Sequence, residues 1–182
     1  MIGLDGAGKT TILNKFQFEE TRQIVTTFGL YVEAIKHSNI EMMVFDVAGD
    51  DRSLWTQYLH NVDVLIWVID STDKERMPII REEMAKITKL MKGQSYLLAL
   101  FFNKQDAENK MSNHEILQKI GLDDLEVGDV LVQKCTASTG EGLGDGLDKI
   151  VEYLSQQKIV KSNSICSKGQ TKKKGNSFTL TT

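Results

Sequence analysis

The sequence contains little cysteine and almost no proline. Two cysteines among 182 residues cannot form a disulfide scaffold, which indicates a protein of a reducing compartment. A single proline against 14 glycines excludes a proline-rich linker and a collagen-like chain. The longest apolar runs, at 64–69 and 96–102, fall far short of the roughly 18 residues that a membrane-spanning helix needs. No apolar signal-peptide core opens the chain, so we expect a cytoplasmic protein.

Charges of the two signs are unevenly distributed along the chain. The net charge is −3, from 22 basic and 25 acidic residues, but six lysines and no acidic residue occur from position 158 onward. The residues before that point therefore carry a net charge of −9. The last segment is also rich in Ser, Thr, Asn and Gly and has no hydrophobic period. We predict one folded domain over 1–157 and a disordered basic tail over 158–182.

Short apolar runs alternate with segments of helical period, which is typical of an α/β domain with a mainly parallel sheet flanked by helices. Strands are predicted at 31–36, 41–45, 62–70, 96–102 and 130–136, and helices at 8–20, 51–61, 74–92, 113–120 and around 147–154. The runs 62–70 and 96–102 are apolar on both faces, which predicts buried strands. Ser112 is expected to cap the helix at 113–120, with Glu115 completing a capping box and Gly121 ending the helix.

The segment Gly3–Thr10 (GLDGAGKT) fits the pattern G-x-x-x-x-G-K-[ST] and precedes a helical pattern. Glycines allow the backbone to approach a polyphosphate, and successive N–H groups with the helix N-terminus form an anion-binding nest. Lys9 is expected to reach the β- and γ-phosphates, and the Thr10 hydroxyl to coordinate Mg²⁺. Taken alone, the motif also fits a glycine-rich helix start that matches by chance. The predicted nucleotide contacts in this segment are Gly3, Leu4, Asp5, Gly6, Ala7, Gly8, Lys9, Thr10 and Thr11.

Asn103, Lys104 and Asp106 follow directly on the buried strand at 96–102. In an α/β sheet, ligands bind beyond the carboxyl ends of the strands, so these side chains are expected at the binding edge. The Asp106 carboxylate matches the N1–H and the exocyclic amine of guanine, a donor pair that adenine lacks. Asn103 is expected to bond the purine or to tie its loop to the phosphate loop, and the Lys104 stem to cover the ring face.

A second base-binding loop is predicted at Thr136, Ala137 and Ser138, which follow the last strand. The backbone N–H of Ala137 is expected to face guanine O6. Each loop alone also fits an ordinary polar loop after a strand, but the occurrence of both favours a guanine site.

A metal site is predicted from Asp46, which ends a strand, and from Gly49 three residues later. This Asp-x-x-Gly spacing places a carboxylate near Mg²⁺ and a glycine N–H near a γ-phosphate. Thr27, between the first helix and the next predicted strand, is the expected loop ligand that completes the metal shell. The predicted metal ligands are therefore Thr10, Thr27 and Asp46.

With these motifs in this order, the chain resembles the small GTPases, and most closely their ADP-ribosylation factor (Arf) and Arf-like branch. The resemblance implies the P-loop NTPase fold and a GTP/GDP switch that uses Mg²⁺ and acts in intracellular vesicle traffic. It also implies exchange factors, GTPase-activating proteins and effectors as partners. The resemblance covers roughly residues 2–157 and rests on Gly3–Leu13, Thr27–Gly29 with Val32 and Glu33, Asp46–Gly49, Leu54–Trp55 with Tyr58, Asn103–Asp106, Thr139–Leu143 and Gly146–Leu147.

Three features depart from this family pattern. Asp50 stands where the family carries the glutamine that orients the attacking water, and it offers no amide donor and adds a negative charge. The stretch 50–55 is shorter than the resemblance leads us to expect. The chain starts at Met1–Ile2, so the strand that precedes the phosphate loop in the family is expected to be largely missing and the chain to be truncated. A myristoylation signal is also absent from this start.

The favoured interpretation is a GTP/GDP switch that hydrolyses GTP slowly, with Lys9 and Asp50 as the candidate catalytic residues. Two alternatives stay open: a nucleotide-binding module with little or no GTPase activity because of Asp50, and a truncated fragment that folds poorly. We expect a monomer that does not bind nucleic acid and that resides in the cytoplasm, with peripheral attachment to Golgi or other endomembranes as an option. The lysine-rich tail is expected to be solvated or to touch anionic lipid weakly.

Overall fold

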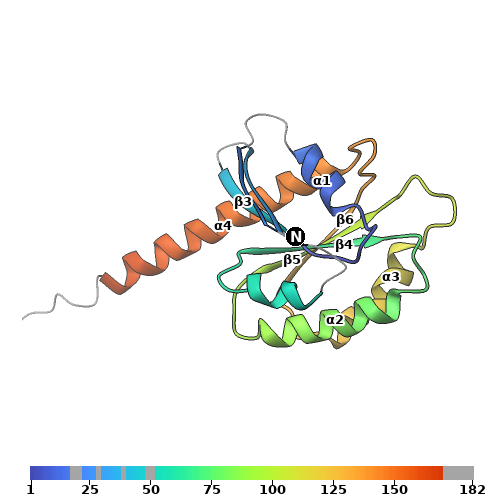
Figure 1. Ribbon diagram of the computed structural model, residues 1–182. Helices are drawn as coiled ribbons and strands as arrows, with labels where there is room; N and C mark the ends of the chain where they lie inside the picture. Colours follow the sequence, from blue (N-terminus) through green and yellow to red (C-terminus); the bar gives the residue numbers. More distant parts are fainter. Residues whose placement is uncertain (17–21, 28–29, 38–39, 48–51, 170–182) are drawn as a thin grey trace, which may run out of the picture.

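The computed structural model describes residues 1–16, 22–27, 30–37, 40–47 and 52–169 (Figure 1). In chain order the elements are α1 (Lys9–Phe16), β1 (Arg22–Thr27), β2 (Leu30–His37), β3 (Ile40–Val47), the 3₁₀ helix η1 (Arg52–Tyr58), β4 (Val64–Asp70), α2 (Met77–Leu90), β5 (Leu97–Asn103), α3 (Asn113–Ile120), the 3₁₀ helix η2 (Leu122–Asp124), β6 (Asp129–Lys134) and α4 (Leu143–Gly169). No helix within these ranges is long and apolar enough to cross a membrane.

The described strands form two three-stranded sheets. In one, β4, β5 and β6 lie parallel in that order, and Asp70 and Asn103 end neighbouring strands in register. In the other, β1, β2 and β3 are antiparallel, and Tyr31 of β2 is paired with Asp46 of β3. The parallel strands β4 and β5 are buried along nearly their whole length, as their unbroken apolar runs predict.

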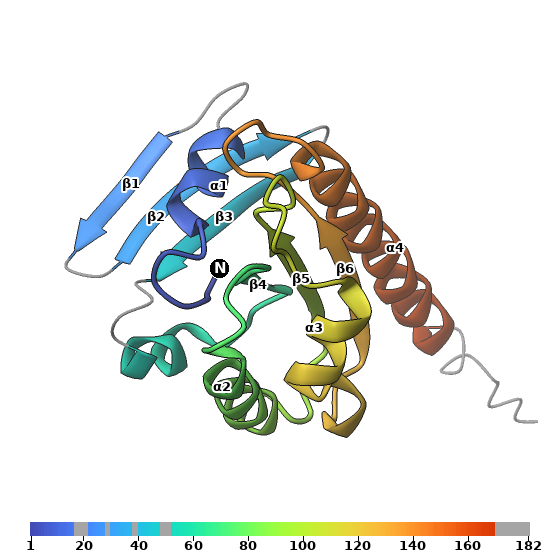
Figure 2. The same cartoon turned by 90° about the vertical axis from the view of Figure 1, so that its right-hand side faces the viewer.

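The start of the chain lies between the two sheets (Figure 2). Ile2 forms a single parallel bridge with Trp67 of β4, because its N–H donates to Ile66 O at 2.9 Å and its carbonyl accepts from Val68 N–H at 2.9 Å. The phosphate loop therefore begins directly at this bridge. The structure thus has a single bridge where the family resemblance predicts a full strand. Strands β3 and β4 belong to separate hydrogen-bonded ladders.

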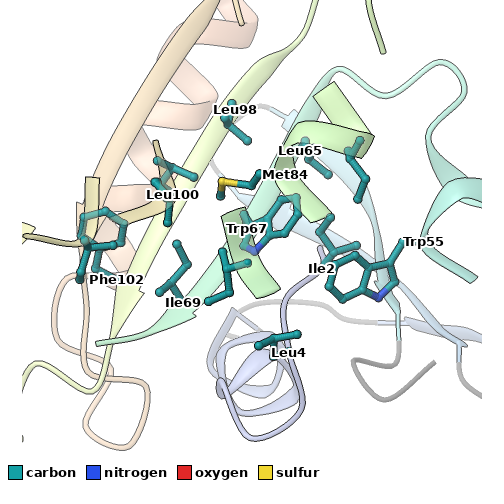
Figure 3. Packing of buried hydrophobic residues seen from close by; sticks show 14 of the residues in the cluster. Ile2, Leu4, Trp55, Leu65, Trp67, Ile69, Met84, Leu98, Leu100 and Phe102 are labelled. Atoms are coloured by element: carbon teal, nitrogen blue, oxygen red, sulfur yellow. The ribbon is translucent and has the colours of Figure 1, made fainter. Parts of the chain in front are cut away.

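The hydrophobic core has two halves, one on each face of the parallel sheet, because successive side chains of a strand point to opposite faces. Figure 3 shows the half formed by Trp67, Ile69 and Leu100 with the α2 residue Met84. On the other face, Val68 and Phe101 pack with residues of α1 and α4. Helices α2 and α3 thus cover one face and α1 and α4 the other.

Trp55 connects the segment after β3 to this core. Its ring lies 5.4 Å from the ring of Trp67, centroid to centroid, at 85°, and only 1% of its surface is exposed. The segment was predicted as a helix over 51–61, but the described part is a short 3₁₀ helix, η1. Asn61, in the turn between η1 and β4, adopts a left-handed backbone (φ 58°).

The structure differs from the sequence prediction most clearly at three places. Residues 22–27 form a strand, β1, where no strand was predicted, so Thr27 ends a strand and does not lie in an open loop. Helix α1 ends at Phe16, earlier than the predicted 20. Helix α4 continues to Gly169, so the backbone from 158 to 169 is helical where disorder was predicted. This stretch has no proline, and a glycine first recurs at its end, so nothing in the backbone chemistry interrupts the helix earlier.

The predicted Ser112 cap and the predicted end of α3 at Gly121 are confirmed. The hydroxyl of Ser112 accepts a hydrogen bond from the Glu115 N–H at 3.1 Å, and Gly121 ends the helix with a left-handed φ of 67°.

Candidate functional site

The phosphate loop, residues 3–10, needs glycine where it approaches the strands. Gly3 and Gly8 have φ values of 147° and 99°. A Cβ on Gly3 would lie 2.3 Å from the Val68 carbonyl oxygen, and a Cβ on Gly8 would lie 2.3 Å from Asn103 Nδ2. The loop is therefore packed directly against β4 and against the end of β5, and larger residues do not fit at these two positions.

Lys9 begins α1 and is buried inside the loop. Its Nζ donates to the carbonyl oxygens of Gly3 at 2.9 Å and Leu4 at 3.1 Å, and only 8% of the residue's surface is exposed. The buried ammonium group contributes a fixed positive charge beside the N-terminus of α1. This charge and the helix N-terminus both favour binding of an anion.

Thr10 connects the loop to the antiparallel sheet. Its hydroxyl donates to Asp46 Oδ2 at 2.9 Å, and Asp46 on β3 is almost fully buried. The structure thus brings together two of the three predicted metal ligands, which are 36 residues apart in the sequence. Thr27, the third, ends β1, and its side chain lies outside the described part of the structure.

Asn103 ties three loops together at the end of β5. Its Nδ2 donates to the Ala7 carbonyl oxygen at 2.8 Å, and its Oδ1 accepts from the Ala137 N–H at 2.9 Å. The predicted link between the Asn103 loop and the phosphate loop is therefore present. The Ala137 N–H was expected to face guanine O6, but in the structure it is directed at Asn103. Thr136 is buried and Ser138 is exposed on the same loop.

Lys104 and Asp106 follow Asn103 with different surroundings. Asp106 is exposed to solvent, so its carboxylate is accessible to a ligand. Lys104 has a left-handed φ of 63°, and its Nζ lies 2.6 Å from Asp70 Oδ2. Burial alone would raise the pKa of Asp70, but hydrogen bonds from Lys104 and Thr72 outweigh burial and hold this pKa below its usual value. The sequence analysis did not single out Asp70, which holds the Lys104 side chain in place.

Gly49 and Asp50, predicted to lie near the γ-phosphate, are outside the described residues. Thr11, the last predicted contact of the loop, lies exposed in the first turn of α1.

Arg76 is a further residue at the site that the sequence analysis did not identify. It precedes α2, and its guanidinium group lies between Asp73 and the loop residue Asp5. Arg76 Nη1 donates to Asp5 Oδ1 at 2.8 Å, and Nη2 donates to the Asp5 carbonyl oxygen at 3.1 Å. No local sequence pattern signals this contact, because the two residues are 71 positions apart.

Two comparisons relate this geometry to known proteins. The model of the ADP-ribosylation factor family matches residues 1–154. The chain belongs to the ADP-ribosylation factor family. This Arf-family chain is also similar to the solved structure of the Arl6 BBS3 small GTPase from Trypanosoma brucei with the bound nucleotide analogue GppNp, at 28% sequence identity and a TM-score of 0.73. The match covers 86% of this chain and 96% of that chain.

The comparisons confirm the predicted family and the α/β fold of a P-loop small GTPase. They also support a guanine-nucleotide-binding switch in general terms, since members of the Arf family are GTPases.

The described residues fit a nucleotide with its metal. The Thr10 hydroxyl and the Asp46 carboxylate offer the oxygen ligands that Mg²⁺ prefers. Gly6 has a left-handed φ of 73°, and a Cβ built on it would meet nothing within 4 Å, so the outer part of the loop faces open space. Together with the buried ammonium of Lys9 and the N-terminus of α1, this left-handed turn favours an anion beside the loop.

Cys135, beneath the base-binding loops, is expected to be chemically inert in the folded protein. Burial raises the pKa of its thiol to about 12, so the thiolate is nearly absent at pH 8. The other cysteine of the chain, Cys166, is replaced by serine so that only Cys135 can react. Alkylation of Cys135 by iodoacetamide at pH 8, measured by mass spectrometry, should be at least a hundredfold slower in the folded Cys166→Ser variant than in the same variant unfolded in urea. Rapid alkylation of the folded chain would contradict this burial.

Proposed function

We propose that this protein is a GTP/GDP-binding molecular switch that binds Mg-GTP and hydrolyses it slowly. One observation carries the proposal: Asp46 and Asn103, from two distant parts of the chain, bond to the glycine-rich loop that contains Lys9 and Thr10. Such convergence supports binding of a polyphosphate, a divalent cation and a base at one site.

Each side chain has a distinct role in this proposal. Lys9 and the loop N–H groups bind the phosphates, and Thr10, Asp46 and Thr27 hold Mg²⁺, which neutralises charge on the phosphates. Asp106 binds the Watson–Crick edge of guanine, while Lys104, held by Asp70, covers one face of the ring. Asn103 acts by fixing the phosphate loop to the base-binding loops.

The switch in this proposal lies in the segments that end at Thr27 and Gly49. Thr27 ends β1 and Asp46 lies near the end of β3, so contacts at the metal and the γ-phosphate bear directly on the antiparallel sheet. When the γ-phosphate is lost, both segments lose a contact and are released. Trp55 lies a few residues beyond Gly49 and packs on Trp67, so its fluorescence is a suitable reporter of this change.

Asp50 determines whether the protein acts as an enzyme or as a nucleotide-binding module with little hydrolysis. A carboxylate about 4 Å from a like charge is repelled by roughly 4 kcal/mol at an effective dielectric constant near 20. About 1.4 kcal/mol corresponds to a tenfold change in rate. Asp50→Gln is therefore expected to increase the single-turnover rate of GTP hydrolysis at least tenfold.

Hydrolysis is measured on preloaded protein by phosphate release, with Asp51→Gln as the matched control. The same substitution one residue along tests whether charge at position 50 itself matters. Fast hydrolysis by the wild-type chain that falls in Asp50→Gln and Asp50→Ala would reject slow hydrolysis and make Asp50 a catalytic residue. Equal, near-zero hydrolysis in all variants with tight GTP binding would favour the nucleotide-binding module.

We further propose that the switch acts in intracellular vesicle traffic, through an exchange factor, a GTPase-activating protein and effectors. Family membership supports this role. In this proposal the protein is a cytoplasmic monomer, with peripheral attachment to Golgi or other endomembranes as an option, and the six lysines from position 158 onward contribute weak attraction to anionic lipid.

A further inference from the structure

The Arg76 guanidinium group is held on both sides. Asp73 accepts from Nε, while Asp5 accepts from Nη1 through its carboxylate and from Nη2 through its carbonyl oxygen. The planar guanidinium suits this fork of acceptors, whereas a lysine offers a single point of attachment. Arg76 therefore connects the segment that follows β4 to the outermost turn of the phosphate loop.

The contact with the Asp5 carbonyl oxygen fixes the direction of a peptide plane. The described part of the chain contains no cis peptide bonds, so the C=O of Asp5 and the N–H of Gly6 point in opposite directions. Because Arg76 holds the C=O, the Gly6 N–H is directed away from Arg76. Gly6 has a left-handed φ of 73° and open space beside it, which is the conformation of a nest that binds an anion.

The contact with the Asp5 carboxylate places a positive charge beside a negative one in the phosphate loop. Asp5 places a negative charge in a loop built for a polyphosphate, and the side chain is exposed. A negative charge beside a bound phosphate repels it and weakens binding. Arg76 neutralises the carboxylate and holds it on the outer side of the loop, since Nη1 and Oδ1 lie 2.8 Å apart.

We propose that Arg76 is a positioning residue of the phosphate loop, which directs the Gly6 N–H toward the phosphates and holds the Asp5 carboxylate away from them. The inference rests on the proposed nucleotide binding at this loop. It assigns to Arg76 an effect on nucleotide affinity through Asp5, without direct contact with the nucleotide.

The test compares Arg76→Gln with Arg81→Gln. Arg81 lies on α2 and forms an exposed ion pair with Asp124 at 2.8 Å, so it controls for the loss of a surface arginine and its partner. We expect Arg76→Gln to weaken binding of a fluorescent GTP analogue that cannot be hydrolysed by about tenfold. The melting temperature of the nucleotide-free chain should change no more than in Arg81→Gln, which itself should bind like the wild type.

Asp5→Asn provides a second variant that separates the two roles. If Arg76 acts through Asp5, the loss caused by Arg76→Gln should be smaller in the Asp5→Asn background, because the repelling charge is already gone. Unchanged affinity in Arg76→Gln would overturn the proposal. A loss of full size in the Asp5→Asn background would overturn the role of the Asp5 carboxylate and assign the whole effect to the contact with the Asp5 carbonyl oxygen, which Asp5→Asn leaves in place. A loss that merely follows a lowered melting temperature would show a structural role and reject positioning.

These outcomes are separate from failure of the proposed function. A wild-type chain that is folded and binds no guanine nucleotide would reject nucleotide binding itself, and Arg76 with it. A wild-type chain that binds, alongside an Arg76→Gln variant that binds equally well, would reject only the role of Arg76.

Discussion

Replacing Lys9 with alanine is expected to lower the affinity for GTP by at least about a hundredfold. The ammonium group is buried in the phosphate loop and already bonded to two loop carbonyls, so its charge is fixed in place before a ligand arrives. Its removal deletes the point charge on the β- and γ-phosphates and leaves those carbonyls without this donor. Affinity for GTP should fall more than affinity for GDP, because the γ-phosphate is the difference between them. Titration with fluorescent analogues of both nucleotides measures the two losses.

Two controls accompany this variant. Lys86→Ala removes an exposed lysine of α2 whose Nζ lies 2.8 Å from Glu82, and it should leave both affinities unchanged. Lys9→Met keeps the aliphatic stem that fills the buried space and removes only the charge, so it should bind as poorly as Lys9→Ala. Unaltered affinity in both Lys9 variants would mean that this loop is not the phosphate site.

Asp106→Asn is expected to shift the base preference from guanine to xanthine. The carboxylate matches two donors of guanine, whereas xanthine carries an acceptor in place of the exocyclic amine, which an asparagine amide can match. A site built around a paired polar group rejects the wrong partner strongly, so GTP affinity should fall at least about a hundredfold. The measurement is a competition of GTP, XTP and ATP against one fluorescent nucleotide.

Asp123→Asn, at an exposed aspartate of η2, serves as the control for the loss of one surface charge. The wild-type chain and this control should both prefer GTP over ATP and XTP. Equal binding of GTP and ATP by the wild-type chain would reject guanine recognition by Asp106.

The parts of the fold that the sequence predicted are those with a strong local signal. Residues 64–70 and 97–103 are apolar at almost every position, a pattern typical of a strand that is covered on both faces. The cap at Ser112 and the glycine at 121 define α3 by hydrogen-bond chemistry within a few residues. In contrast, β1 has a mixed polar sequence, RQIVTT, and becomes a strand through its pairing with β2, a partner that no local pattern reveals.

The same distinction applies to the candidate site. The glycines and Lys9 were predicted because their chemistry is contained in eight consecutive residues. The contacts of Arg76 with Asp5 and of Lys104 with Asp70 depend on parts of the chain that only the fold brings together. For Ala137, no local pattern indicates that its N–H donates to the Asn103 oxygen, because that contact joins two loops 34 residues apart.

The two separate ladders of this protein affect how it unfolds. The antiparallel sheet reaches the phosphate loop through Asp46 and Thr10, and the parallel sheet reaches it through Asn103 and Ala7. A ligand seated on that loop therefore binds both sheets at once and stabilises the state in which they are joined. We therefore expect the domain to unfold in one cooperative transition when nucleotide is bound, and the antiparallel sheet to open at a lower free energy than the parallel sheet when it is not.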